Sequence, residues 1–128
     1  MRLRGSLFLI ALATFGSLSP PVAAATGDMT VATFLSKYEA LKKKGLFALG
    51  SPEIATLKAE GEAAGAAYGA RLKADRAAGR PAHSCPPANS RLSQSEFLRG
   101  IQQYPTASRG QVTLKIAVAD LMRKKFPC

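Results

Sequence analysis

Two cysteines, Cys85 and Cys128, and a single histidine, His83, are the side chains of this 128-residue chain best suited to covalent or metal chemistry. Redox-active thiols usually occur as Cys-x-x-Cys, a motif that the sequence lacks. Two cysteines and one histidine also fall short of the four ligands of a structural zinc site. His83 could act as a base only beside a positioned nucleophile, and its proline-rich surroundings indicate none. We therefore expect no catalytic site, no metal and no cofactor, and a protein that is not an enzyme.

Acidic and glycine motifs lead to the same expectation. Glu60 and Glu62 lie two residues apart in a helical pattern, so they point to different faces and not into one acid–base site. Gly61, Gly65 and Gly69 lie inside that pattern without a preceding strand, which excludes a nucleotide-binding loop. Each glycine costs about 1 kcal/mol inside a helix relative to alanine. Their four-residue spacing predicts close contact with another helix, either of this chain or of a second copy in a homodimer.

Residues 1–25 have the three parts of a secretory signal peptide. Two arginines precede a short apolar run, and small residues follow it. This run is shorter than the roughly 20 apolar residues of a membrane span, and no longer one follows downstream. We expect cleavage after Ala24 or Ala25, no membrane span, and a periplasmic or secreted protein in which 26–128 form a single domain.

An exported chain meets an oxidising environment, and its two cysteines allow one intramolecular pairing. We therefore predict a disulfide between Cys85 and Cys128. The closed loop would hold about 44 residues, for which loop entropy gives at most about 4 kcal/mol of stabilisation. The bridge would also hold the last residue of the chain against a mid-chain loop.

The net charge of the chain is +10, and removal of the signal peptide leaves 16 basic and 8 acidic side chains, a net charge of +8. The basic residues are spread over the whole domain and do not alternate with aromatic residues that could stack on bases, so we expect no nucleic-acid partner. An acidic protein or an anionic envelope polymer fits an exported basic surface better. Plain solubility is the alternative explanation of the charge.

Helical periodicity appears four times in 26–128, and no stretch alternates over the length of a strand. Helix starts are indicated by Ser51-Pro52-Glu53, an N-cap followed by proline, and by Ser93-Gln94-Ser95-Glu96, a capping box. The helical patterns cover about 30–44, 51–79, 93–104 and 112–126. We predict an all-α fold, a small four-helix bundle stapled by one disulfide.

The C-terminal half carries a recognisable arrangement of motifs. It opens with Cys85-Pro86-Pro87, continues through a capped helix to Tyr104-Pro105, and closes with Phe126-Pro127-Cys128. This arrangement resembles the Tai-type immunity proteins, small periplasmic helical proteins associated with the amidase effectors of type VI secretion. The chain departs from many members in having no cysteine in its N-terminal half.

The resemblance implies an inhibitor that binds an exported effector, a cell-wall amidase, and so protects the producing cell. Such an inhibitor needs a rigid body with aromatic or arginine anchors. Our candidates for partner contact are Arg76, Arg80 and His83, at the predicted end of the second helix and in the proline-rich connector 80–91 that follows it. The alternative function is that of a general periplasmic helical protein that binds the envelope or responds to stress.

Overall fold

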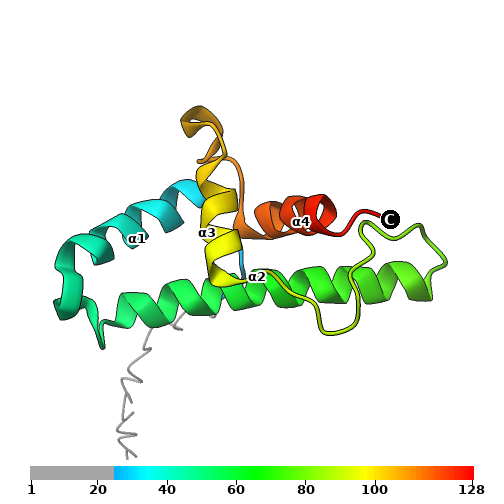
Figure 1. Cartoon of the computed structure of the whole chain (residues 1–128), viewed down its shortest axis with the longest axis horizontal. Helices are drawn as coiled ribbons and strands as arrows, with labels where there is room; N and C mark the ends of the chain where they lie inside the picture. The colour runs from blue at the N-terminus through cyan, green and yellow to red at the C-terminus, as the bar shows by residue number, and fades with distance from the viewer. Residues whose placement is uncertain (1–24) are drawn as a thin grey trace, which may run out of the picture.

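The computed structural model describes residues 25–128, so the predicted signal peptide lies outside the described residues except for Ala25. The described chain contains helices and turns and no strand, which confirms the all-α prediction (Figure 1). Its elements are α1 (Val31–Lys44), the short 3-10 helix η1 (Gly45–Ala48), α2 (Pro52–Ala77), α3 (Gln94–Gln102), η2 (Thr106–Ser108) and α4 (Leu114–Lys125). None of these helices is both long enough and apolar enough to cross a lipid bilayer.

Each of the four α-helices is preceded by a Ser or Thr N-cap, whose side-chain oxygen accepts a backbone N–H of the first turn. The helix starts predicted at Ser51 and at the capping box of Ser93 and Glu96 are confirmed. The helical pattern predicts that the last helix starts at about 112, whereas α4 begins at Leu114. The Val112 carbonyl lies outside the helix and accepts the backbone N–H of Val31 at 2.8 Å.

The longest helix, α2, is the spine of the fold, and its 26 residues span roughly 39 Å. The other helices lie along or across it in Figure 1, and α4 packs against it most extensively. Apolar side chains from all four helices meet at this contact and form one core. Its buried members are Val31, Phe34, Leu35, Leu57, Ala64, Tyr68, Ile101, Leu114, Ala117, Val118, Ala119 and Met122.

An extended segment, 26–30, runs between α2 and α4 before the first helix begins. The backbone N–H of Leu114 donates to the Met29 carbonyl at 2.9 Å, and that of Lys115 donates to the Gly27 carbonyl at 3.1 Å. On the other side the carboxylate of Glu60, from α2, accepts backbone N–H groups of this segment. The first residues of the domain are therefore fixed to two helices at once.

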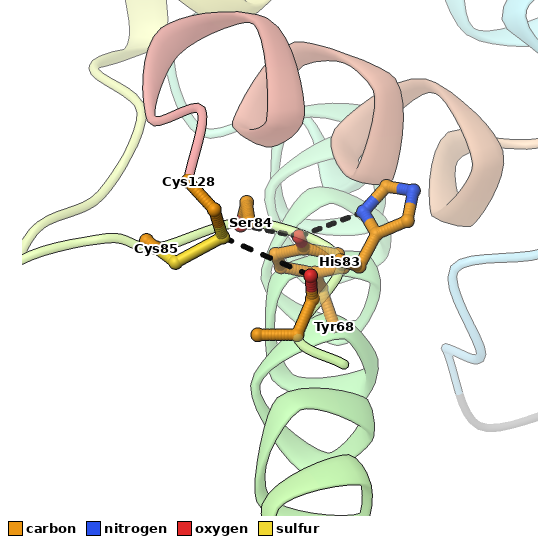
Figure 2. Close-up of a disulfide and its surroundings, with 6 residues drawn as sticks. Tyr68, His83, Ser84, Cys85 and Cys128 are labelled. Atoms are coloured by element: carbon orange, nitrogen blue, oxygen red, sulfur yellow. Dashed lines mark hydrogen bonds between the residues drawn. A yellow bond between two sulfur atoms is a disulfide. The ribbon is translucent and has the colours of Figure 1, made fainter. Parts of the chain in front are cut away.

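The predicted disulfide between Cys85 and Cys128 is present (Figure 2). The two Cα atoms are 4.9 Å apart, within the usual range for a disulfide. Next to it, the Cys85 N–H donates to the Phe126 carbonyl at 2.9 Å. The connector between α2 and α3 is thus joined to the end of α4 by one covalent bond and one backbone hydrogen bond.

The glycine row of α2 does not make the contact that we expected within the chain. A Cβ atom placed on Gly61, Gly65 or Gly69 would have no neighbouring atom within 4 Å, so no described helix packs against them. The structure places Glu60, and not Gly61, on the core face of α2, in register with Leu57. The row is therefore rotated away from the core, and its proposed role in a homodimer stays a prediction.

Candidate functional site

An open groove of about 1030 Å³ runs along the described chain. Helices α1 and α2 diverge from the turn at 45–51 (Figure 1). The groove is lined by residues of both helices, of the connector and of the start of α3. Apolar side chains of α1 and α3 line the walls, among them Phe34, Tyr38, Leu41, Phe97 and Leu98. Its volume is at the upper end of the range for small-molecule sites. An open shape and apolar walls are also typical of grooves that receive a helix.

The glycine row forms part of the surface of this groove. Gly61, Gly65 and Gly69 all line it, and the space above them is free of protein atoms. Without side chains on three successive turns, the backbone of α2 is accessible to an incoming helix or loop. The same spacing that predicted a helix contact is therefore found at an unoccupied surface.

Four exposed charged side chains line the groove, of which three are basic and one is acidic: Lys42, Lys58, Arg91 and Glu62. Lys58 pairs with Glu62 at 3.9 Å, and Lys42 pairs with Glu39 at 3.4 Å. The side chains in both pairs are at least half exposed, so each pair contributes little and could be exchanged for a partner's carboxylate. The groove thus combines apolar walls with mostly basic charged side chains.

The turn between α1 and α2 carries an exposed apolar cluster, which we call the tip and define as Leu46, Phe47 and Leu49. The exposed fractions of these side chains are 84%, 94% and 73%. Leu49 also lines the groove, so the tip and the groove form one continuous apolar surface. Continuous exposed apolar surface of this kind is typical of a protein interface.

The predicted contact residues Arg76, Arg80 and His83 lie near the far end of α2 and in the connector, outside the lining of the groove. Arg80 is engaged within the fold, since its Nη2 atom is 2.8 Å from Oδ1 of Asp75. Arg76 is exposed in the last turn of α2. The role of these three side chains in partner binding stays a prediction.

His83 belongs to a small polar cluster beside the disulfide. Figure 2 shows the Tyr68 side chain of α2 directed at His83 and Ser84. The Tyr68 hydroxyl is 3.0 Å from Nδ1 of His83 and shares a hydrogen bond of 2.5 Å with the Ser84 hydroxyl. Burial lowers the pKa of His83, and the nearby Arg71 and Arg123 lower it further.

This cluster does not have the arrangement of a nucleophile and its base. Ser84 is 2% exposed, and its hydroxyl is bonded to Tyr68 and not to the imidazole. The Tyr68 hydroxyl lies between the other two groups, so the cluster joins α2 to the connector where the disulfide is formed. Its geometry indicates a structural role. Among residues 25–128, no group of three or more His, Cys, Asp or Glu side chains is placed to hold a metal ion.

Several carboxylates outside the groove fix the helices in place. Glu96 accepts hydrogen bonds from Lys125 and from the Ser93 backbone, which lower its pKa to about 2. Asp28 has a lowered pKa because it is hydrogen-bonded to Lys115, with Nζ and Oδ1 3.0 Å apart. These groups connect elements that are distant in sequence and are not directed into the groove.

Comparison with protein-family models, with curated proteins and with solved structures gives no match to this chain. The interpretation of the site therefore depends on its own geometry.

The groove could not be predicted from the sequence, because it depends on the angles between helices. Hydrophobic periodicity predicts helices and their apolar faces, and it gives no information on these angles. Sequence reasoning also missed the buried carboxylate of Glu60. One signal was present: Glu60 falls at helical spacing between Leu57 and Ala64, both of which are buried. An acid in register with apolar residues predicts a buried carboxylate with dedicated donors.

Proposed function

We propose that this protein is an exported immunity protein that binds a secreted cell-wall amidase and blocks it, so that the producing cell is protected. The observation that carries the proposal is the apolar groove with its basic side chains and exposed tip. The resemblance of the C-terminal half to Tai-type immunity proteins supplies the class of partner. The disulfide, which is compatible with an oxidising compartment, supports the location outside the cytosol.

The chemistry of the groove indicates what part of the amidase it would receive. Its apolar walls favour an apolar stripe, and the glycine row leaves room for a helix to approach α2 closely. Lys42, Lys58 and Arg91 favour acidic side chains on either side of that stripe. We therefore propose that the amidase presents an amphipathic helix or helix-like loop with acidic flanks. Inhibition follows if this segment borders the substrate cleft.

The proposal is tested by capturing partners from periplasmic extract of the producing strain on the tagged, oxidised protein. We expect a captured hydrolase that cleaves amide bonds in purified peptidoglycan, and we expect its activity to fall when the protein is added. A capture without such a hydrolase, or a hydrolase whose activity the protein leaves unchanged, would contradict the proposal.

A variant in the groove separates this surface from others. Gly65→Leu places a side chain in the free space of the groove, and leucine favours the helix more than glycine does. Ala70→Leu is the matched control, because Ala70 is exposed on the same helix and does not line the groove. We expect Gly65→Leu to abolish inhibition and Ala70→Leu to retain it.

A second candidate function is association with anionic envelope polymers. It is favoured by the net charge of +8 after removal of the signal peptide and by exposed basic runs such as 42–44 and 123–125. This function predicts binding to peptidoglycan or lipopolysaccharide that weakens strongly as salt rises from about 0.05 to about 0.5 M. Substitutions in the groove would leave such binding unchanged.

A further inference from the structure

The carboxylate of Glu60 is buried against the start of the domain and is surrounded by backbone donors. Its Oε1 atom is 3.1 Å from the backbone nitrogen of Thr26. Its Oε2 atom is 2.9 Å from the nitrogen of Gly27 and 3.3 Å from that of Met29. Glu60 is 9% exposed, whereas Ala25 and Thr26 are exposed. A buried carboxylate thus lies beside the first described peptide bond of the domain.

The other charged groups near this segment are already paired with each other. Lys115, at the start of α4, bonds Asp28 through Nζ and Oδ1 at 3.0 Å. Glu60 has no cationic side chain within ion-pair distance among the described residues, so its negative charge is balanced by backbone dipoles alone. A cation at the Thr26 nitrogen would complete the site.

We propose that the signal peptide is cut between Ala25 and Thr26, and that the new α-ammonium group of Thr26 forms an ion pair with Glu60. The inference rests on the export part of the proposed function and is independent of the partner. Ala23 and Ala25 supply the small residues that a signal peptidase requires before such a cut. A cut after Ala24 would leave an uncharged amide at Thr26 and place the charge one residue further from Glu60.

The covalent step is hydrolysis of one peptide bond. Water adds across the bond between the Ala25 carbonyl carbon and the Thr26 nitrogen, and this bond breaks. The water oxygen remains on Ala25 as part of a carboxylate, and both water protons end on the Thr26 nitrogen, which becomes the ammonium group. No oxidant, reductant or further reactant is needed.

The consequence is a fold that is more stable after processing than before it. In the uncut chain the Thr26 N–H donates to Glu60 as a neutral amide. After the cut, the same contact becomes a charge-assisted hydrogen bond at a partly buried site, which is stronger than the neutral one. The exported form is then fixed to α2 at its first residue, next to the contacts of 27–30 with α4.

The position of the cut is tested by the intact mass of the protein recovered from periplasm. We expect a chain that begins at Thr26. A chain that begins at Ala25 would overturn the inference while leaving export unaffected. An uncut chain would overturn both, whereas failure to inhibit an amidase bears only on the proposed partner.

The ion pair is tested by thermal unfolding of three oxidised proteins of otherwise equal sequence. One begins at Thr26, a second begins at Ala25, and a third begins at Thr26 with an acetylated α-amino group. The latter two keep a neutral N–H at Thr26 and lack a charge on its nitrogen. We expect the first to unfold about 4–8 °C above both others. Equal unfolding temperatures would overturn the ion pair.

A substitution at the carboxylate gives an independent readout. Glu60→Gln keeps the size of the side chain and removes its charge. In this background the protein that begins at Thr26 should unfold at the same temperature as its acetylated form. If the difference in unfolding temperature stays as large as in the wild-type protein, the ammonium group stabilises the fold through a group other than Glu60. If Glu60→Gln does not fold, the comparison of the three wild-type forms still decides the question.

Discussion

Gly27 lies where the backbone of α2 leaves no room for a side chain. Its φ is +77°, a conformation that favours glycine, and it packs directly on α2. A Cβ atom at this position would lie 2.7 Å from the Cα and N atoms of Ala64. Close approach of the extended segment 26–30 to α2 therefore depends on glycine here, and not on the glycines of α2 itself.

Gly27→Ala should lower the free energy of unfolding by roughly 2–4 kcal/mol, because the new methyl group meets backbone that cannot move independently and the positive φ becomes strained. The measurement is urea unfolding of the oxidised protein. Gly65→Ala is the control at an open site, where the better helix propensity of alanine should leave stability unchanged or raise it by about 0.5–1 kcal/mol. A tolerated Gly27→Ala would contradict the packing described.

Glu96 should make the free energy of unfolding depend on pH in the acidic range. Its pKa is lowered from 4.5 to about 2 by hydrogen bonds from Lys125 and from Ser93. Because the folded state holds the carboxylate in its charged form, this contribution is complete above about pH 4.5 and is lost as the pH falls towards 2. Unfolding followed by circular dichroism between pH 2 and 7 should show the loss.

The matched variant for this prediction is Glu96→Gln, which can still cap the Ser93 backbone and carries no charge. Its stability should change less between pH 4.5 and 2 than that of the wild-type protein. Identical pH profiles would mean that the pair with Lys125 adds nothing in solution.

At the scale of the helices, the local signals in the sequence were sufficient to predict their number and the starts of α2 and α3. Caps such as Ser51 and Ser93 act within one turn, so the sequence specifies them directly. The orientation of α2 was harder to predict, because its abundant Ala and Gly residues define the apolar face weakly. Glu60, on the core face, accepts hydrogen bonds from the backbone of 26–30, a segment that has no periodicity of its own.

The tip between α1 and α2 should be dispensable for folding and required for binding. Leu46 and Phe47 are mostly exposed, so the double substitution Leu46→Ser with Phe47→Ser should change the free energy of unfolding by less than about 0.5 kcal/mol. If the tip contacts the amidase as proposed, inhibition should weaken at least tenfold, which corresponds to about 1.4 kcal/mol.

The control for the tip is Ile116→Ser. Ile116 is 48% exposed on α4 and does not line the groove. Inhibition should be unaffected by this substitution. A double variant at the tip that inhibits as well as the wild-type protein would exclude the tip from the interface and leave the groove alone as the candidate.

At the scale of the whole molecule, two connections hold the ends of the domain, one to α2 and one to the connector that follows it. The extended segment 26–30 is bound by Glu60 of α2, and Cys128 is bound by Cys85. The disulfide could be predicted from composition and compartment, because one pairing was possible. The groove could not, since it exists only where α1, α2 and the connector leave a space that the chain's own side chains do not fill.

Removing the disulfide should reveal how much of the fold depends on it. The cysteines are 43 positions apart, and a loop of that size gives at most about 4 kcal/mol of stabilisation through the unfolded state. That is a large part of the roughly 5–15 kcal/mol expected for the whole domain. The double variant Cys85→Ser with Cys128→Ser should therefore unfold at much lower urea concentration than the oxidised protein.

The variant should also loosen the molecule unevenly. The connector and the end of α4 would keep only local contacts, such as the hydrogen bond from Cys85 N–H to the Phe126 carbonyl and the bonds of the Tyr68 hydroxyl. Hydrogen exchange should speed up there first, while the contact between α2 and α4 near Ala64 and Leu114 stays protected. Reduction of the wild-type protein should reproduce this pattern. Uniform loss of protection would mean instead that the bridge stabilises a single cooperative unit.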